Sequence, residues 1–394
     1  DVRFDGAVTL GRIGFAYILF ISLTALMSGM LNAAGKFAVT SVVTVLLSLT
    51  MIAGMLLAAR MGWDMGRTLA WSVTISGVLQ LLATWAAVRH LGYRLPFRWP
   101  HLTPDLRRLA VIAAPAVLAG GVVQINLIVG RQVASLTDGA VVWLYNADRI
   151  YQLPLGVVGI AIGIVLLPDL SRRLRAEDHE GSRASFNRGT EFALLLTLPA
   201  AVALMVIALP IISVLFQRGE YGPEATSNTA WALAAYGAGL PAFVLHKVLQ
   251  PLFYAREDTR SPFRYAVNSM VVNAALAIGL LPLIGWLAAA VATTAAAWVM
   301  VWQLWHGSRA MGDAARLDDR FRYRLPRIAF ASALMGAVLW GLTLPLAGTL
   351  ATPGLRTPAL GGLVLAGMAG YFGTVLAIGG MSWVELKGAF RRQR

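Results

Sequence analysis

Residues 124–173 read QINLIVGRQVASLTDGAVVWLYNADRIYQLPLGVVGIAIGIVLLPDLSRR, and this stretch decides the fold. Two long apolar segments meet at a short turn, 136–140, with Arg131 before the turn and Arg149 after it. An ionisable side chain in hydrocarbon costs roughly 2.5–3.5 kcal/mol, so it is kept only where protein or water shelters it. At a rise of about 1.5 Å per residue, Arg131 lies roughly 9 Å and Arg149 roughly 14 Å from the turn. The stretch therefore predicts two antiparallel membrane helices with two positive charges at similar depth, suited to an anionic ligand.

The composition extends this prediction to the whole chain. Of 394 residues, 58% are hydrophobic and 13% are charged, and the mean hydropathy is +0.67. A soluble domain carries about 25% charged residues, whereas apolar stretches of about 20 residues match a ~30 Å hydrocarbon core. We expect an all-α polytopic membrane protein with eleven transmembrane helices. The expected spans are 13–34, 38–59, 69–91, 107–137, 140–167, 189–216, 226–248, 265–283, 285–305, 327–347 and 359–380.

The basic residues alternate between the two ends of these spans. One side holds 25 of the 33 Lys and Arg residues and the other holds 6, with Arg131 and Arg149 inside. Such an asymmetry is the positive-inside pattern, so the C-terminus is predicted to be cytoplasmic. The net charge of +14 then reports topology and gives no reason to expect a nucleic-acid partner. The absence of cysteine excludes disulfides, thiolate metal sites and cysteine nucleophiles.

Two features concern the organisation of the chain. It begins at Asp1 without a methionine or signal peptide, so we expect an N-terminal truncation. The main internal boundary is a cytoplasmic stretch with three prolines and several basic and aromatic residues, which predicts an interfacial linker over 92–106.

The strongest candidate site lies in the opening stretch. Arginine binds phosphate through a planar fork and stays charged at physiological pH, so Arg149 and Arg131 are candidate phosphate ligands and Asp148 is a candidate orienting partner. An alternative is a structural ion pair between Arg131 and Asp148, which leaves Arg149 unpaired. Pro154 removes one backbone hydrogen bond and predicts a helix kink beside the carbonyl of Ile150.

Other candidates carry weaker signals. Asn273 and Thr293 place oxygen ligands on two adjoining spans, as a sodium site needs, although interhelical hydrogen bonds are the alternative explanation. Lys247 is expected to end a span and to extend its ammonium group to the cytoplasmic face. We find no HExxH, P-loop, GxSxG or carboxylate-pair motif, so neither an enzyme nor a metal centre is expected.

Several motifs along the chain belong to a recognisable pattern. The most specific one is Leu144-Tyr145-Asn146-Ala147-Asp148-Arg149 with Leu153-Pro154-Leu155-Gly156 and Leu166-Leu167-Pro168. Further ones are Tyr17-Ile18-Leu19-Phe20-Ile21-Ser22-Leu23, Leu198-Pro199-Ala200-Ala201, Phe216-Gln217-Arg218-Gly219, Phe253-Tyr254-Ala255-Arg256 and Asp258-Thr259-Arg260. In these motifs, which span nearly the whole chain in order, the sequence resembles the MurJ (MviN) family of lipid II flippases.

The resemblance implies a fourteen-helix, two-lobe flippase in which this chain supplies helices 4–14. Residues 1–91 would then be the remainder of the N-terminal lobe, 107–306 the C-terminal lobe, and 307–394 a final helix pair with a lipid-tail groove and a basic tail. Arg149 takes the place of the arginine in the family's eighth helix, whereas the other essential arginines lie in helices that this chain lacks. Gly130 stands where many members have aspartate in a sodium site that Asn273 and Thr293 otherwise resemble, which puts sodium coupling in doubt.

The implied function is the outward flipping of lipid II, an undecaprenyl-pyrophosphate disaccharide-pentapeptide, across the bacterial cytoplasmic membrane by alternating access through a cationic cavity. No cofactor is expected, and sodium or the membrane potential is the candidate energy source. Membrane lipids and cell-wall synthesis and division proteins are candidate partners. The alternatives are a flippase for another polyprenyl-pyrophosphate glycan, a drug antiporter of the same class, and a non-transporting scaffold for cell-wall synthesis.

Overall fold

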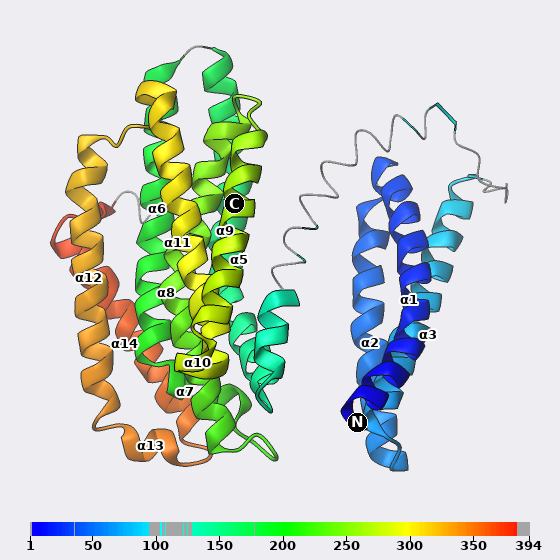
Figure 1. Cartoon of the computed structure of the whole chain (residues 1–394). Coiled ribbons are helices and arrows are strands. Elements are labelled where there is room, and N and C mark those ends of the chain that lie inside the picture. The colour runs from blue at the N-terminus through cyan, green and yellow to red at the C-terminus, as the bar shows by residue number, and fades with distance from the viewer. Residues whose placement is uncertain are drawn as a thin grey trace. The chain divides into compact units, whose positions relative to one another are not determined.

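A computed structural model describes residues 2–34, 36–93, 128–176 and 178–383, together with isolated residues between 103 and 124. The chain forms two compact units, Asp1–Thr103 and Pro104–Arg394. The described residues of both units are helices and short connections (Figure 1). The predicted linker, 92–106, lies largely outside the described residues.

The first unit contains three helices, α1 (Val2–Ala33), α2 (Phe37–Met61) and α3 (Met65–His90). Gly62, with φ of 66°, ends α2 in the left-handed region that glycine adopts without a Cβ penalty. Asp64 then caps α3, because its side chain accepts a hydrogen bond of 2.7 Å from the backbone N–H of Arg67.

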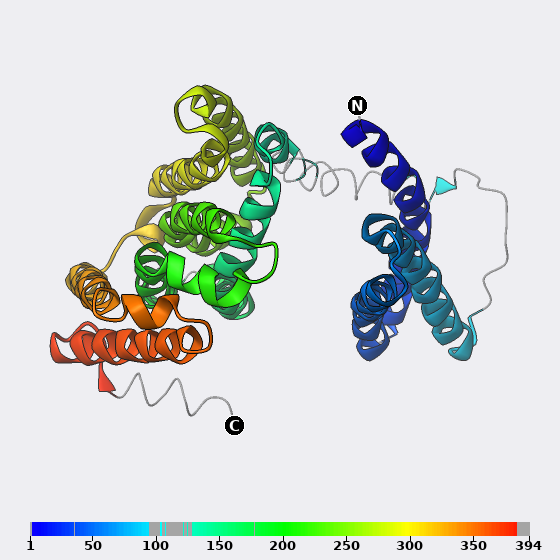
Figure 2. The same cartoon turned by 90° about the horizontal axis from the view of Figure 1, so that it is seen from below.

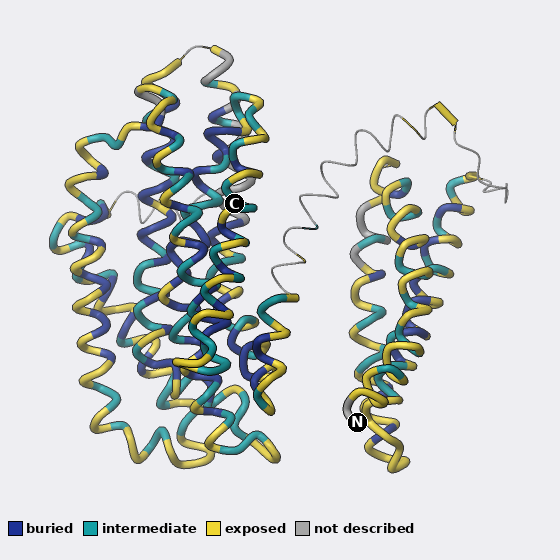
Figure 3. Tube along the Cα trace, in the orientation of Figure 1, coloured by how far each residue is buried: buried dark blue, intermediate teal, exposed yellow. Residues whose placement is uncertain are grey.

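Several polar side chains of this unit are buried, and many of its large apolar side chains are exposed. Figure 3 shows how exposed and buried positions alternate along the three helices. Gln80 of α3 is buried and donates to the carbonyl of Val43 on α2 at 2.9 Å. Thr74, also on α3, donates to the carbonyl of Ile13 on α1 at 2.8 Å. In water this distribution would leave a large apolar surface exposed. In a lipid bilayer the same distribution is favourable, because it buries the polar groups to which lipid cannot hydrogen-bond. The burial pattern is therefore that of a membrane-embedded unit.

The second unit contains the remaining helices in chain order. They are α5 (Ala140–Arg175), α6 (His179–Val206), α7 (Ala208–Phe216), α8 (Pro223–Tyr254), α9 (Arg260–Gly279), α10 (Leu281–Ile284), η1 (Gly285–Leu287), α11 (Ala288–Ser308), η2 (Arg309–Ala315), α12 (Asp319–Thr343), α13 (Ala347–Ala351) and α14 (Arg356–Ala377). Helix α8 packs against α5, α6, α7 and α11, and its hydrophobic window is 67% buried, the largest share among the candidate spans. Helices α12 and α14 lie together at one edge of this unit (Figures 1 and 2).

Eight described helices are long and apolar enough to cross a membrane, which confirms a polytopic membrane protein. They correspond to α1, α2, α3, α6, α8, the segment around α11, α12 and α14. The expected span 107–137 lies mostly outside the described residues, of which 128–135 are helical. The expected span 189–216 is two helices, because the chain departs from helical geometry at Ile207 (φ −110°, ψ 27°) between α6 and α7.

A cluster of charged residues joins the beginning of α6 to the beginning of α12. Glu191 is buried and accepts hydrogen bonds from Arg188 at 2.7 Å, Arg324 at 2.5 Å and Arg320 at 3.2 Å. Arg188 also pairs with Asp318, whose side chain caps α12. One buried carboxylate therefore holds arginines from two helices.

Helix α14 is attached to α6 by a hydrogen bond that depends on a proline. Pro199 has no N–H, so within α6 the carbonyl of Leu195 loses its helical partner. The buried hydroxyl of Tyr371 on α14 donates to this carbonyl at 2.6 Å. The bond satisfies a backbone group that would otherwise be unpaired in the membrane.

Candidate functional site

The predicted turn joins helical residues 128–135 to α5. Its backbone hydrogen bonds run from Thr137 N–H to the Ala134 carbonyl at 3.1 Å and from Ala140 N–H to the Thr137 carbonyl at 3.2 Å. Gly139 has φ of 82°, and a Cβ there would come within 2.9 Å of the Trp143 ring. Glycine is therefore required both by the backbone and by the indole that packs over it.

Arg149 lies on the exposed face of α5 and is oriented by one neighbour. Its Nη2 donates to the hydroxyl of Tyr145 at 2.8 Å, and its Cζ lies 4.9 Å from the centre of the Tyr145 ring. Tyrosine is a neutral partner, so the full positive charge of the guanidinium remains available to an anion.

Asp148 lies beside this arginine and is half-buried. It is hydrogen-bonded to Gln152 and to the hydroxyl of Tyr151. Both Arg149 and Arg131 are close enough to interact electrostatically with its carboxylate. Among the described residues, however, neither arginine forms an ion pair with it. The structure thus brings together the three predicted residues, with Arg131 exposed like Arg149.

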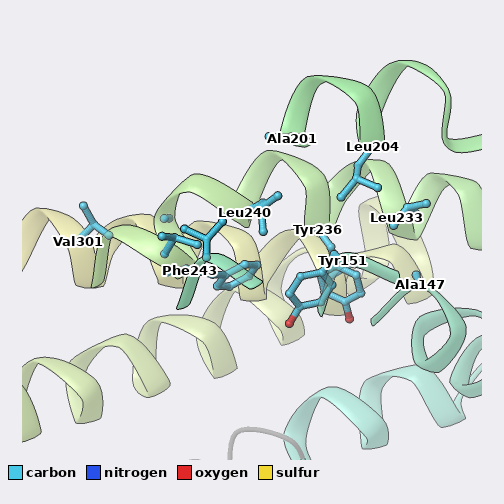
Figure 4. Packing of buried hydrophobic residues seen from close by; sticks show 14 of the residues in the cluster. Ala147, Tyr151, Ala201, Leu204, Leu233, Tyr236, Leu240, Phe243 and Val301 are labelled. Atoms are coloured by element: carbon cyan, nitrogen blue, oxygen red, sulfur yellow. The ribbon is translucent and has the colours of Figure 1, made fainter. Parts of the chain in front are cut away.

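The opposite face of α5 fixes the orientation of this site. Tyr151 is buried and stacks on Phe243 of α8 with ring centres 5.2 Å apart, and it lies 5.0 Å from the ring of Tyr236 (Figure 4). This aromatic packing holds α5 against the most buried helix of the unit. The charged face of α5 is therefore presented away from the core.

Sequence reasoning missed the two neighbours that orient the charged groups. Tyr145 precedes Arg149 by four residues, and Asp148 precedes Gln152 by four. Residues four apart on a helix are neighbours, so this spacing was the signal that could have identified both pairs.

Helix α5 runs as one helix from Ala140 to Arg175 across Pro154. The proline has no N–H, so the carbonyl of Ile150 has no helical partner at the level of the site.

The candidate ion ligands form an interhelical contact. The Asn273 amide on α9 donates to the Thr293 hydroxyl on α11 at 3.4 Å, and this hydroxyl donates to the carbonyl of Ala289 at 2.8 Å. Asn273 is buried. The part of the chain that the structure describes contains no group of three or more His, Cys, Asp or Glu residues able to hold a metal ion.

An apolar cavity of about 290 Å³ lies between α6, α12 and α14. Its lining includes Pro199, Leu339, Gly367, Met368 and Tyr371. Gly367 lies against the Leu339 side chain, with a hypothetical Cβ 3.2 Å from it, so the missing side chain keeps these two helices close.

The fold and the site define a polytopic membrane protein with cationic side chains on an exposed helix face and, elsewhere in the same unit, an apolar cavity between α6, α12 and α14. Comparison with known proteins identifies the family. A profile of the lipid II flippase MurJ family matches residues 2–352. The chain is 42% identical over 398 residues to a probable lipid II flippase MurJ of Rhizobium tropici, covering 100% of this chain and 74% of that protein. It is 35% identical over 387 residues to the corresponding protein of Vibrio cholerae, covering 96% and 72%.

A solved structure of lipid II flippase MurJ in the inward closed conformation has the same fold, with a TM-score of 0.75 and 22% sequence identity over 93% of this chain and 73% of that chain. The chain belongs to the lipid II flippase MurJ family. It is thus a multi-pass membrane protein of a bacterial transporter family, in agreement with the expectation that it is not an enzyme.

Proposed function

We propose that this chain flips lipid II from the inner to the outer leaflet of the bacterial cytoplasmic membrane. Family membership supports the transport activity. The observation that supports the binding site is the exposed guanidinium group of Arg149, which is hydrogen-bonded to Tyr145. In this proposal the eleven expected spans are helices 4–14 of a fourteen-helix protein whose C-terminus is cytoplasmic.

Arg149 and Arg131 bind the pyrophosphate of the substrate. A pyrophosphate offers several anionic oxygens, and each arginine offers a planar fork that can bind two of them. Asp148 acts as the orienting partner: its charge lies near both guanidinium groups without pairing with either among the described residues. The substrate phosphate can therefore engage the arginines without first breaking an ion pair.

The lipid tail takes the apolar cavity between α6, α12 and α14 as part of its path. The cavity is almost wholly apolar and is lined on one side by the glycine-containing face of α14. Moving a polyprenyl chain from lipid into an apolar groove changes its free energy little, because both surroundings are apolar. The groove therefore guides the tail, and the arginines provide the binding affinity.

The energy source is either sodium or the membrane potential. Asn273 and Thr293 are the candidate sodium ligands, although their mutual hydrogen bond also gives them a structural role. The sodium site is supported if transport by the parent protein depends on external sodium and this dependence is lost in Asn273→Ala. Transport that depends on the membrane potential alone argues against the site.

The test is lipid II translocation in cells depleted of their own flippase and supplied with the full-length protein. Arg149→Ala removes the charge-assisted contacts and is expected to reduce transport at least tenfold, because such a hydrogen bond contributes about 1.5–3 kcal/mol. Arg264→Ala, which removes an exposed arginine that also lies over a tyrosine, is the matched control and should transport normally.

Failure of the well-inserted parent to move lipid II would favour another polyprenyl-pyrophosphate glycan, an antiporter substrate or a scaffold role. Equal rescue by the parent and Arg149→Ala would keep the flippase and remove Arg149 from its binding site.

A further inference from the structure

A second cation, Lys247, lies within the second unit and makes a contact that the sequence did not predict. Helix α8 continues past Lys247 to Tyr254, so the Lys247 Cα lies about 10 Å before the end of the helix. The lysine is half-buried. Its side chain extends across α5, where a Cβ on Gly159 would come within 2.9 Å of the Lys247 Nζ.

The ammonium group of Lys247 has no hydrogen-bond or ion-pair partner among the residues that the structure describes. A charged group in a membrane helix is costly, and it is usually kept for a substrate or ion path. The absence of a side chain at Gly159 leaves the space in which this ammonium group lies.

The position of Gly159 on α5 relates this lysine to Arg149. With about 100° per residue, Arg149, Gly156 and Gly163 lie within about 40° of one another around α5, and Gly159 lies about 80° from Arg149. Lys247 therefore lies at the margin of the α5 face that carries Arg149. Along the helix axis, Gly159 is about 15 Å from Arg149 in the direction of the basic, cytoplasmic end.

We propose that Lys247 is an entry contact for the substrate phosphate, which it holds before the phosphate reaches Arg149. The inference rests on the proposed function and adds a step to it. A lysine presents a single mobile point charge, whereas arginine binds phosphate bidentately. A weaker cation at the cytoplasmic side and a stronger one deeper inside capture the anion and then release it inward.

The experiment uses the full-length protein reconstituted in proteoliposomes, with initial flipping rates measured over a range of lipid II mole fractions. Lys247→Gln removes the charge and is expected to raise the half-saturating mole fraction about tenfold, as loss of one charge-assisted contact does, with the maximal rate within about twofold of the parent. Lys247→Arg keeps the charge and should stay near the parental value. Lys36→Gln, which removes an exposed cation of the first unit, is the matched control.

A second variant tests the same contact without removing the charge. Gly159→Ala displaces the ammonium group and should raise the half-saturating mole fraction in the same direction. Melting temperatures of all variants are measured in parallel, and Gly159→Ala replaces Lys247→Gln as the test if the latter does not fold.

The outcomes separate the two proposals. A parent that does not move lipid II refutes the proposed function itself. A parent that transports, with Arg149→Ala impaired and Lys247→Gln unchanged in half-saturation, overturns the entry contact alone. Equal loss in Lys247→Gln and Lys247→Arg also overturns it, because charge is then not what the position supplies.

Discussion

Replacing Glu191 with glutamine should destabilise the second unit through the loss of one buried charge. The side chains of Glu191 and Arg324 are 10% and 14% exposed. The hydrogen bond between these two charged groups therefore contributes about 1.5–3 kcal/mol to stability. The side chains of Arg188 and Arg320 are 36% and 40% exposed, and solvent screening reduces each of those pairs to about 0–1 kcal/mol. Glu191→Gln is therefore expected to cost about 2–4 kcal/mol, since it also leaves three arginines without their shared anion.

The assay is thermal unfolding of the purified protein in detergent. A change of 1 kcal/mol shifts the melting temperature of a large domain by about 2 °C, so Glu191→Gln should lower it by about 4–8 °C. Glu220→Gln, at an exposed loop position between α7 and α8, is the control and should lie within about 1 °C of the parent. In a double-mutant cycle, Glu191→Gln and Arg324→Gln should show a coupling energy of about 1–3 kcal/mol. A shift no larger than that of Glu220→Gln, or additive single effects, would refute the assigned role of the buried carboxylate.

Three further outcomes are expected from other positions. Tyr371→Phe removes the hydroxyl that satisfies a free carbonyl of α6 and should cost about 1–3 kcal/mol in thermal unfolding; an unchanged melting temperature contradicts this. Hydrogen bonds from the backbone N–H and then the side chain of Ser261 hold the pKa of Asp258 below its ordinary value of 3.8. The stabilisation from this carboxylate is therefore present above pH 3.8 and is lost as the pH falls through the lower folded pKa. The Asp258 carboxylate accepts hydrogen bonds from the backbone N–H groups of Arg260 and Ser261 at the start of α9. Asp258→Ala should therefore cost about 1 kcal/mol at pH 7, with a difference in stability from the parent that narrows below about pH 4; a difference that does not change with pH argues against this role of the carboxylate. Gly336→Ala places a Cβ within 2.5 Å of the Val202 side chain and should lower the melting temperature by about 2–6 °C as α12 is pushed from α6, whereas no change would show that the contact can relax.

The sequence predicted the features that follow from local hydropathy and local charge. The turn before α5, the helical character of the flanking residues and the meeting of Arg131, Asp148 and Arg149 all follow from short spacings within one hairpin. Their binding roles stay predictions until transport is measured.

Features that depend on distant partners were not predictable in this way. Glu191 and Arg324 are 133 residues apart, and no periodic pattern relates them. The contact between Lys247 and Gly159 was not predicted because it joins α8 to α5, and α8 itself continues past Lys247, through Pro251, to Tyr254. A membrane helix tolerates such a proline when neighbouring groups satisfy the freed backbone.

The hydrogen bond between Tyr371 and the carbonyl freed by Pro199 has a consequence for the history of the family. Proline at position 199 leaves the Leu195 carbonyl without its helical donor, and the tyrosine hydroxyl donates to that carbonyl instead. With alanine at position 199 the helical N–H would satisfy the carbonyl, and a hydroxyl at position 371 would no longer be needed for that purpose. The two positions, 172 residues apart in the chain, should therefore be linked among relatives, with a hydroxyl-bearing side chain at 371 wherever 199 is proline.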